Sequence, residues 1–73
     1  MNHKYSVDHV LDTLTLNSDG SLGGYIDSAL FFVRIHGNVY VSSIFENGTI
    51  YETSNKSHFK AVSDCLTQYY QEN

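Results

Sequence analysis

Residues 29–53 carry the strongest pattern of hydrophobic and polar positions in the chain, ALFFVRIHGNVYVSSIFENGTIYET. Short runs rich in β-branched and aromatic residues, which favour strands, are separated by the dipeptides Gly37-Asn38 and Asn47-Gly48. Both dipeptides accept the positive φ that two-residue hairpin loops require. The pattern therefore predicts three antiparallel strands joined by two tight hairpins.

The lengths of the two loops decide which side chains share a face of this sheet. With two residues in each loop, His36 pairs with Val39 and Glu46 pairs with Thr49, and side chains alternate between the faces. One face then holds Phe31, Val33, Ile35, Tyr40, Ser42, Ile44, Tyr51 and Thr53. The other holds Leu30, Phe32, Val39, Val41, Phe45 and Ile50, with Arg34, His36, Ser43 and Glu52 among them. A three-residue first loop would instead exchange the faces of one strand.

The C-terminal segment predicts an amphipathic helix from about residue 56 to about residue 71. Its apolar stripe repeats at three and four residues and consists of Phe59, Val62, Leu66 and Tyr69. Residues 54–57 offer several N-caps, and Cys65 and Tyr70 flank the stripe. We expect the stripe to pack on the sheet face that carries no charge, which includes Phe31, Val33 and Ile44.

The N-terminal quarter of the chain fits more than one pattern. Val7, Val10, Leu11 and Leu14 fall at helical spacing behind Ser6, a fair N-cap, whereas residues 13–16 alternate as a strand does. We predict a short helix over about residues 6–12, a strand from about residue 14, and a turn at residues 17–20. Residues 22–26 contain Gly23 and Gly24, which leaves a bulged edge strand and a mobile loop as alternatives.

Together these elements predict a single α+β domain over residues 1–73. It is an antiparallel meander of three to five strands packed against a C-terminal amphipathic helix, with a short N-terminal helix or strand. An antiparallel sheet in a monomer usually has one face in water, but here both faces have an apolar majority. Because one helix covers one face, the other must meet the N-terminal segment, a second copy of the chain or a different protein.

Composition and charge narrow the classes of partner. The chain has 73 residues, 41% of them hydrophobic and 14% aromatic, which is enough for a core. Its formal net charge is −4, with only four Lys and Arg residues, so nucleic-acid binding is not expected. No segment approaches the roughly 18 apolar residues of a membrane span, and no apolar run follows the first residues. We therefore expect a cytoplasmic protein with no membrane partner.

Candidate chemistry is sparse, and we expect no catalytic residues, no metal and no cofactor. The single Cys65 cannot form an intramolecular disulfide. The four histidines, His3, His9, His36 and His58, form no pair at the spacing of a tight metal site. Arg34 and Glu52 share a predicted sheet face, where we interpret them as a structural ion pair rather than as catalytic groups. The chain is accordingly predicted not to be an enzyme.

The surface left uncovered is the most informative functional feature of the sequence. The candidate protein-binding residues are Phe32, Arg34, Val41, Phe45 and Glu52 on the second sheet face, together with Tyr70 beside the helix stripe. In size, acidity and lack of chemistry, the chain resembles in general character the single-domain inhibitors that phages and other mobile elements encode against host proteins or defence complexes. The alternatives are a structural or regulatory homodimer, and a small-ligand-binding domain with its site at a dimer interface.

Overall fold

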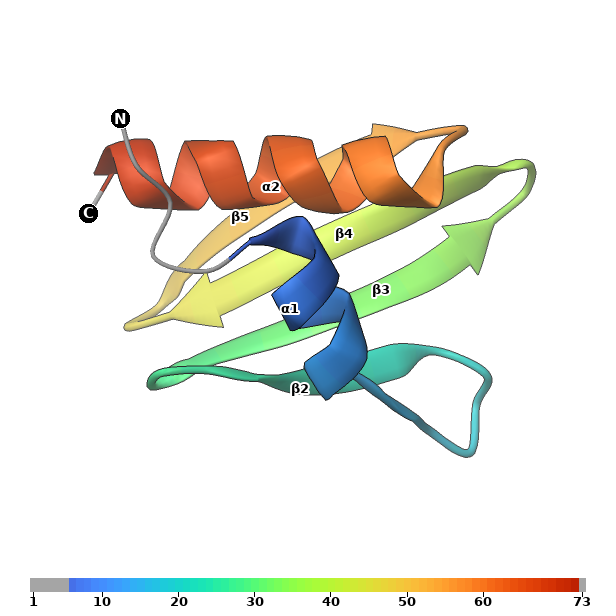
Figure 1. Cartoon of the computed structure of the whole chain (residues 1–73), viewed down its shortest axis with the longest axis horizontal. Helices are drawn as coiled ribbons and strands as arrows, with labels where there is room; N and C mark the ends of the chain where they lie inside the picture. The colour runs from blue at the N-terminus through green and yellow to red at the C-terminus, as the bar shows by residue number, and fades with distance from the viewer. Residues whose placement is uncertain (1–5, 73) are drawn as a thin grey trace.

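The computed structural model describes residues 6–72 and shows an antiparallel sheet with both helices on the same side of it (Figure 1). In chain order the elements are α1 (Val7–Thr13), β1 (Thr15–Leu16), β2 (Leu22–Ile26), β3 (Ala29–His36), β4 (Val39–Glu46), β5 (Thr49–Asn55) and α2 (His58–Glu72). The strands lie side by side in the order β1-β2-β3-β4-β5. The predicted α+β meander with its C-terminal helix is confirmed.

Both central hairpins have the predicted two-residue loops. His36 pairs with Val39 across the first loop, and Glu46 pairs with Thr49 across the second. The backbone at the second loop has positive φ at both positions, +52° at Asn47 and +82° at Gly48, which matches the twist of the flanking strands. The predicted assignment of side chains to the two faces of β3, β4 and β5 therefore holds.

The segment with two glycines is a regular strand rather than a loop. β2 pairs with β3 along its whole length, from Leu22 opposite Val33 to Ile26 opposite Ala29. The glycines allow neighbouring chain to approach closely, because a Cβ at Gly24 would lie 3.2 Å from the carbonyl oxygen of Thr13. The pairing of β2 with β3 and this close contact with the chain at Thr13 compensate for the weak strand propensity of the two glycines.

The N-terminal segment forms both elements that its sequence predicts, a short helix followed by a strand. Ser6 caps α1, since its Oγ accepts a hydrogen bond of 3.1 Å from the backbone N–H of His9. At the other end, the Thr13 hydroxyl donates to the carbonyl oxygen of Val10 at 2.7 Å. The strand pattern then begins at Thr15, where β1 pairs with β2 over only two residues.

α1 packs on the same sheet face as α2, so it does not cover the second face. Val10, 1% exposed, and Val7 belong to the core cluster that contains residues of α2 and of the sheet. The buried members of this cluster are Val7, Val10, Ile26, Ala29, Phe31, Val33, Ile44, Val62, Cys65, Leu66 and Tyr69. The N-terminal segment within residues 6–72 thus does not cover the second face. A second copy of the chain and a different protein are the two covers left from the prediction.

α2 begins at His58, about two residues later than predicted. The Ser57 Oγ accepts a hydrogen bond from the N–H of Lys60 at 3.3 Å, and the Asn55 side chain accepts one from the N–H of Ser57 at 2.9 Å. Ser57 is therefore the N-cap of the helix. Inside the helix Cys65 is fully buried, at the centre of the packed face rather than beside it.

The prediction that Phe59 belongs to the buried stripe is wrong, because its side chain is 51% exposed. The buried face runs through Val62, Cys65 and Tyr69, and one turn earlier it passes through His58 instead of Phe59. The His58 ring stacks on Tyr40 of β4, with ring centroids 4.8 Å apart and planes 7° apart. An aromatic pair thus completes the first turn of the helix interface.

Two hydrogen bonds join α2 to the edge strand below it. The Thr53 hydroxyl donates to the carbonyl oxygen of Ala61 at 2.6 Å, and the Cys65 thiol donates to the carbonyl oxygen of Tyr51 at 3.4 Å. At the C-terminal half of the helix, the Tyr69 hydroxyl donates to Glu46 Oε2 at 3.3 Å. These bonds fix the helix along β5 and the end of β4.

We predict that Leu66→Ala lowers the free energy of unfolding by about 2–5 kcal/mol, because it leaves a cavity at a fully buried position. Urea unfolding measures the change. Gln68→Ala, on the exposed side of the same helix, is the matched control and should change stability by less than about 0.5 kcal/mol. An unchanged urea midpoint for Leu66→Ala would contradict the packing of α2 on the sheet.

A second prediction concerns Cys65. Burial raises the pKa of the thiol from 9.0 to about 11, although the nearby hydroxyls of Ser42 and Thr53 act in the opposite direction. Below pH 9 the thiol is neutral in both states, so its contribution to stability is fully present; as pH rises from 9 through 11, the unfolded thiol ionises first and that contribution is lost.

The measurement is the difference in unfolding free energy between the native chain and Cys65→Ala at a series of pH values. We expect this difference to be constant from neutral pH to pH 9 and then to shrink up to pH 11. All other side chains are common to both proteins, so the difference isolates the contribution of the thiol. A difference that stays constant through pH 11 would show that the thiol is not buried as the structure has it.

Candidate functional site

The sheet face turned away from both helices, here called the open face, is the candidate site. Its side chains on β2 to β5 are Tyr25, Leu30, Phe32, Arg34, His36, Val39, Val41, Ser43, Phe45, Ile50, Glu52 and Ser54. Figure 1 shows α1 and α2 lying together across the opposite face. Within residues 6–72, no helix lies over the open face.

An apolar row crosses this face from β2 to β5. Tyr25 pairs with Leu30, Leu30 pairs with Phe45, and Phe45 pairs with Ile50, so the four side chains are cross-strand neighbours. Tyr25 is 70% exposed, Phe45 42% and Ile50 63%, while Leu30 is half-buried between its neighbours. Directly paired side chains contact one another across strands, so the row is a continuous apolar strip open to solvent.

A polar cluster lies beside the apolar row. Glu52 Oε2 accepts a hydrogen bond from the Ser43 hydroxyl at 3.1 Å and lies 3.5 Å from Nη2 of Arg34. The ion pair expected from the sequence is therefore present. Both charged side chains are about half exposed, so the pair stabilises the fold by at most about 1 kcal/mol.

Val41 and Ser43 are buried although no described helix covers the open face. Val41 is 8% exposed and Ser43 2%. They lie on the central strand β4, between β3 and β5, whose larger side chains Phe32, Arg34 and Glu52 flank them on this face. The outer side chains of this face are therefore the exposed ones, and the middle of β4 is recessed between them.

Arg34 lines several hollows, and two of them also include other side chains of the open face. One, of about 500 Å³, is lined by Asp19, Gly20, Ser21, Phe32, Arg34 and Ile35. The other, of about 320 Å³, is lined by Arg34, His36, Val39, Val41, Glu52, Thr53 and Ser54. Among residues 6–72 no group of three or more His, Cys, Asp or Glu side chains could hold a metal ion, and His3 lies outside the described residues.

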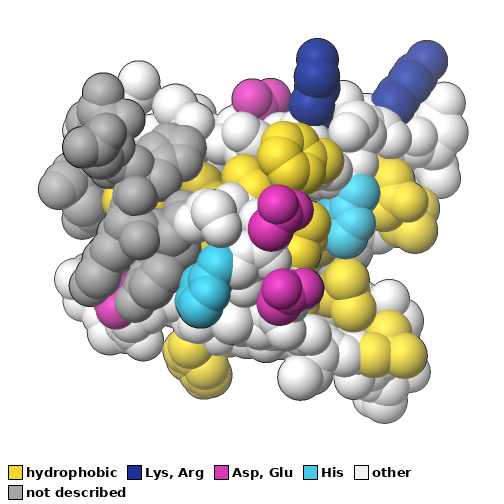
Figure 2. Space-filling view, in the orientation of Figure 1, with side chains coloured by type: hydrophobic (Ala, Val, Ile, Leu, Met, Phe, Trp, Pro, Cys, Tyr) yellow, Lys and Arg dark blue, Asp and Glu magenta, His cyan; other side chains and the backbone are white. Residues whose placement is uncertain are grey.

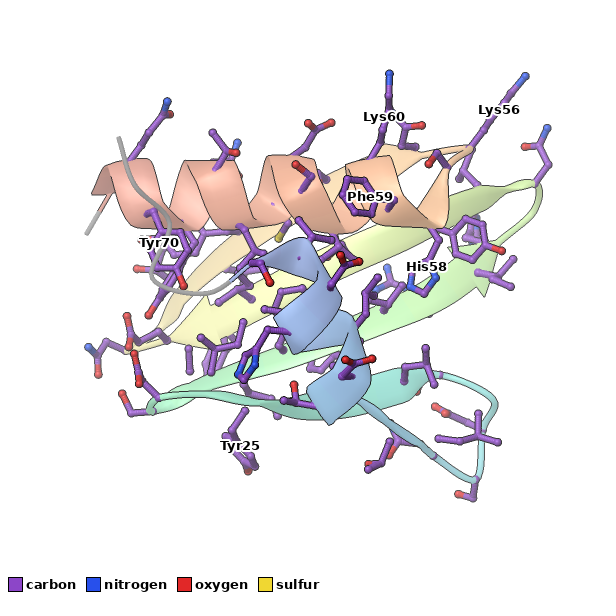
Figure 3. The ribbon with its side chains drawn as sticks, in the orientation of Figure 1. Tyr25, Lys56, His58, Phe59, Lys60 and Tyr70 are labelled. Atoms are coloured by element: carbon purple, nitrogen blue, oxygen red, sulfur yellow. The ribbon has the colours of Figure 1, made fainter. Side chains whose placement is uncertain are left out.

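Five of the six residues predicted to bind a partner are brought together on the open face: Phe32, Arg34, Val41, Phe45 and Glu52. Tyr70 is not among them. It lies on α2, half-buried against the core, with its ring centroid 5.3 Å from that of Tyr69 (Figure 3). Tyr70 therefore lies on the opposite side of the sheet from the open face.

Sequence reasoning missed Tyr25, which extends the apolar row onto β2. Gly23 and Gly24 obscure the strand character of residues 22–26, so the sequence does not assign the partner of Leu30 on that side. The signal was the two-residue spacing between Leu22, Gly24 and Ile26, which places Tyr25 on the other face.

The helix-covered side has a different surface. Figure 2 shows hydrophobic, acidic and histidine side chains mixed across it. Phe59 and His58 lie at the same end of α2 on this side (Figure 3). The His58 Nε2 atom is buried and has no hydrogen-bond partner among the described residues, so the ring acts there through its stacking on Tyr40.

Two side chains of the core, Cys65 and Tyr69, have raised pKa values, which favours the neutral form of each. Burial raises the pKa of Tyr69 to about 12, and the nearby Glu46 carboxylate adds to the effect. Cys65, with its pKa raised to about 11, stays a thiol at neutral pH. Both side chains are buried in the core and hydrogen-bonded there, Cys65 to the carbonyl oxygen of Tyr51 and Tyr69 to Glu46.

No protein-family model, no curated protein and no solved structure matches this chain. Neither helix within residues 6–72 is long and apolar enough to cross a membrane. The class of this protein is therefore described from its own fold and surface. It is a small α+β domain whose helices share one sheet face and whose other face carries an exposed apolar strip beside an ion pair.

We predict that Phe45→Asp preserves the fold and lowers the free energy of unfolding by no more than about 1 kcal/mol, because the side chain is already 42% exposed. Phe31→Asp, on the covered face of the adjacent strand, should abolish cooperative folding, since it buries a charge at a fully buried position. Circular dichroism with urea unfolding compares the two variants. Equal destabilisation by both would contradict the assignment of the faces.

Proposed function

We propose that this chain is a small non-enzymatic module that binds another protein through its open face. The observation that supports this function best is the strip formed by Tyr25, Leu30, Phe45 and Ile50, which is apolar, continuous and exposed. Contiguous apolar surface rimmed by polar groups is typical of protein interfaces. Aromatic residues and Arg are enriched in such interfaces, and Arg34 lies on the same face, separated from Leu30 of the strip by Phe32.

The binding module acts by occupying a surface of its partner. The apolar strip supplies the area that is desolvated, and the pair of Arg34 and Glu52 sets the orientation, because a partner's charges must complement both. The narrower form of the proposal is an inhibitor, encoded by a phage or another mobile element, that blocks a host protein or defence complex in the cytoplasm. The small size and net charge of −4 are compatible with such a blocking protein.

Two alternatives use the same surface. In the first, the open faces of two copies bury each other's strips, and the chain is a structural or regulatory homodimer. In the second, a small ligand binds at such a dimer interface, where the hollows beside Arg34 would provide space. Both alternatives require self-association, whereas the proposed function does not.

The test of the proposed function is affinity capture from the native host with three matched variants. Phe32→Asp and Phe45→Asp place a charge on the open face, and Phe59→Asp makes the same change at a position of α2 that is 51% exposed. We expect a specific partner to be captured by the native chain and by Phe59→Asp, and to be lost with the two open-face variants. Capture that is equally strong with all variants would overturn binding through the open face.

Light scattering of the native chain at micromolar concentration separates the alternatives. We expect a monomer, because the proposed partner is a different protein. A dimer that Phe45→Asp dissociates and Phe59→Asp does not would replace the proposed function with the homodimer. The control is the urea midpoint of each variant, which must stay close to that of the native chain.

A further inference from the structure

The two edges of the sheet are protected very differently. The edge at β1 is only two residues long, and beyond it the chain around Thr13 packs closely against Gly24 of β2. The edge at β5 extends over seven residues, contains no proline, and pairs only with β4 within the described part of the chain. A long unprotected edge strand offers free backbone hydrogen-bonding groups to another strand.

The register identifies these backbone groups. In a two-residue hairpin the residues that flank the loop form a hydrogen-bonded pair, and such pairs then alternate along an antiparallel ladder. Counting from the pair of Glu46 and Thr49, the residues of β5 that turn their N–H and C=O groups away from β4 are Ile50, Glu52 and Ser54. Their side chains all lie on the open face, so the free edge and the open face are continuous.

We propose that the β5 edge binds an extended segment of another protein as an added antiparallel strand, with a Lys or Arg opposite Glu52 and an apolar residue opposite Ile50. The added strand satisfies the outward backbone groups of β5. Its apolar residue extends the strip that ends at Ile50, which is 63% exposed. Its cation meets the carboxylate of Glu52, which is half exposed.

The position of Glu52 argues for a different protein over a second copy of this chain. Residue 52 is the midpoint of β5, which spans Thr49–Asn55. Antiparallel pairing of β5 with itself along its full length therefore places Glu52 directly opposite Glu52 of the copy, and like charges in that position are destabilising. The same carboxylate favours a strand with a cation there, so one residue both opposes self-pairing and selects the partner.

Glu52 retains capacity for this additional contact. Ser43 and Arg34 both contact its Oε2 atom, which leaves Oε1 for the cation of the added strand. The Arg34 contact of 3.5 Å is long and half exposed, so a second cation on the outer side of Glu52 does not have to displace it. Ser43 holds the carboxylate in place from the β4 side.

The test uses the full chain labelled with nitrogen-15 and a synthetic heptapeptide, acetyl-Ser-Thr-Thr-Lys-Thr-Ile-Thr-amide, at millimolar concentration. The peptide sequence puts its Lys opposite Glu52 when its Ile is opposite Ile50. We expect its addition to shift the amide signals of Ile50, Glu52 and Ser54 and to slow their hydrogen exchange. No change at these three amides, or changes confined to α2, would overturn the proposal.

A charge exchange tests the selection by Glu52. We expect a peptide with Glu in place of its Lys to bind the native chain about five- to tenfold more weakly. Glu52→Lys should reverse this order and favour the Glu peptide, and an unchanged amide spectrum elsewhere shows that the variant is folded. Equal affinity of the native chain for both peptides would overturn the role of Glu52.

This inference rests on the proposed function only in that both require a protein partner, and the two can fail separately. The peptide itself is the added strand, so its binding does not depend on the native partner. If the peptide binds and Phe45→Asp still captures the partner as strongly as the native chain does, the proposal for the β5 edge stands. The proposal that the partner binds through the open face would then be wrong. Self-association through β5, seen as a dimer that Glu52→Lys alters and Phe45→Asp does not, would overturn the choice of a different protein.

Discussion

The register set by the two-residue loops at residues 37–38 and 47–48 is the constraint on which the rest of the structure depends. Because side chains on a strand alternate between faces, a shift of one residue would move every apolar residue of a strand to the opposite face. With the observed register, Phe31 and Ile44 lie under the helices and Phe32 and Phe45 lie opposite them. The core, the position of α2 and the open face all follow from these two turns.

Both helices pack on one face of the sheet, and this leaves the other face without a helix over it within residues 6–72. A chain of 73 residues has a small core, and this one concentrates α1, α2 and one sheet face into a single cluster. Apart from Val41, the buried apolar side chains of the described residues thus lie on one side of the sheet. On the other side, Tyr25, Phe45 and Ile50 contribute apolar surface that stays exposed in the described fold.

The sequence was sufficient wherever a local pattern determined the structure. The turn at Asn47-Gly48 has few backbone alternatives, so the strand pairing and the two faces could be predicted from it. The first turn of α2 could not, because Phe59 fits the apolar stripe as well as His58 does, and the stacking of His58 on Tyr40 decided between them. Likewise, the side taken by α1 and the strand at Gly23 and Gly24 depend on tertiary packing, which no local pattern encodes. How much of Tyr70 is buried depends on tertiary packing in the same way, because the core extends along α2 as far as its ring.

Isoleucine methyl groups report whether the open face is exposed in solution. Ile44 and Ile50 lie on neighbouring strands and opposite faces, and they are 0% and 63% exposed. With a soluble paramagnetic agent added to the methyl-labelled full chain, we predict strong relaxation of the Ile50 methyl groups and little relaxation of those of Ile44. Equal protection of both residues in the isolated chain would contradict the exposure of the open face, since another segment or a second copy would then already cover it.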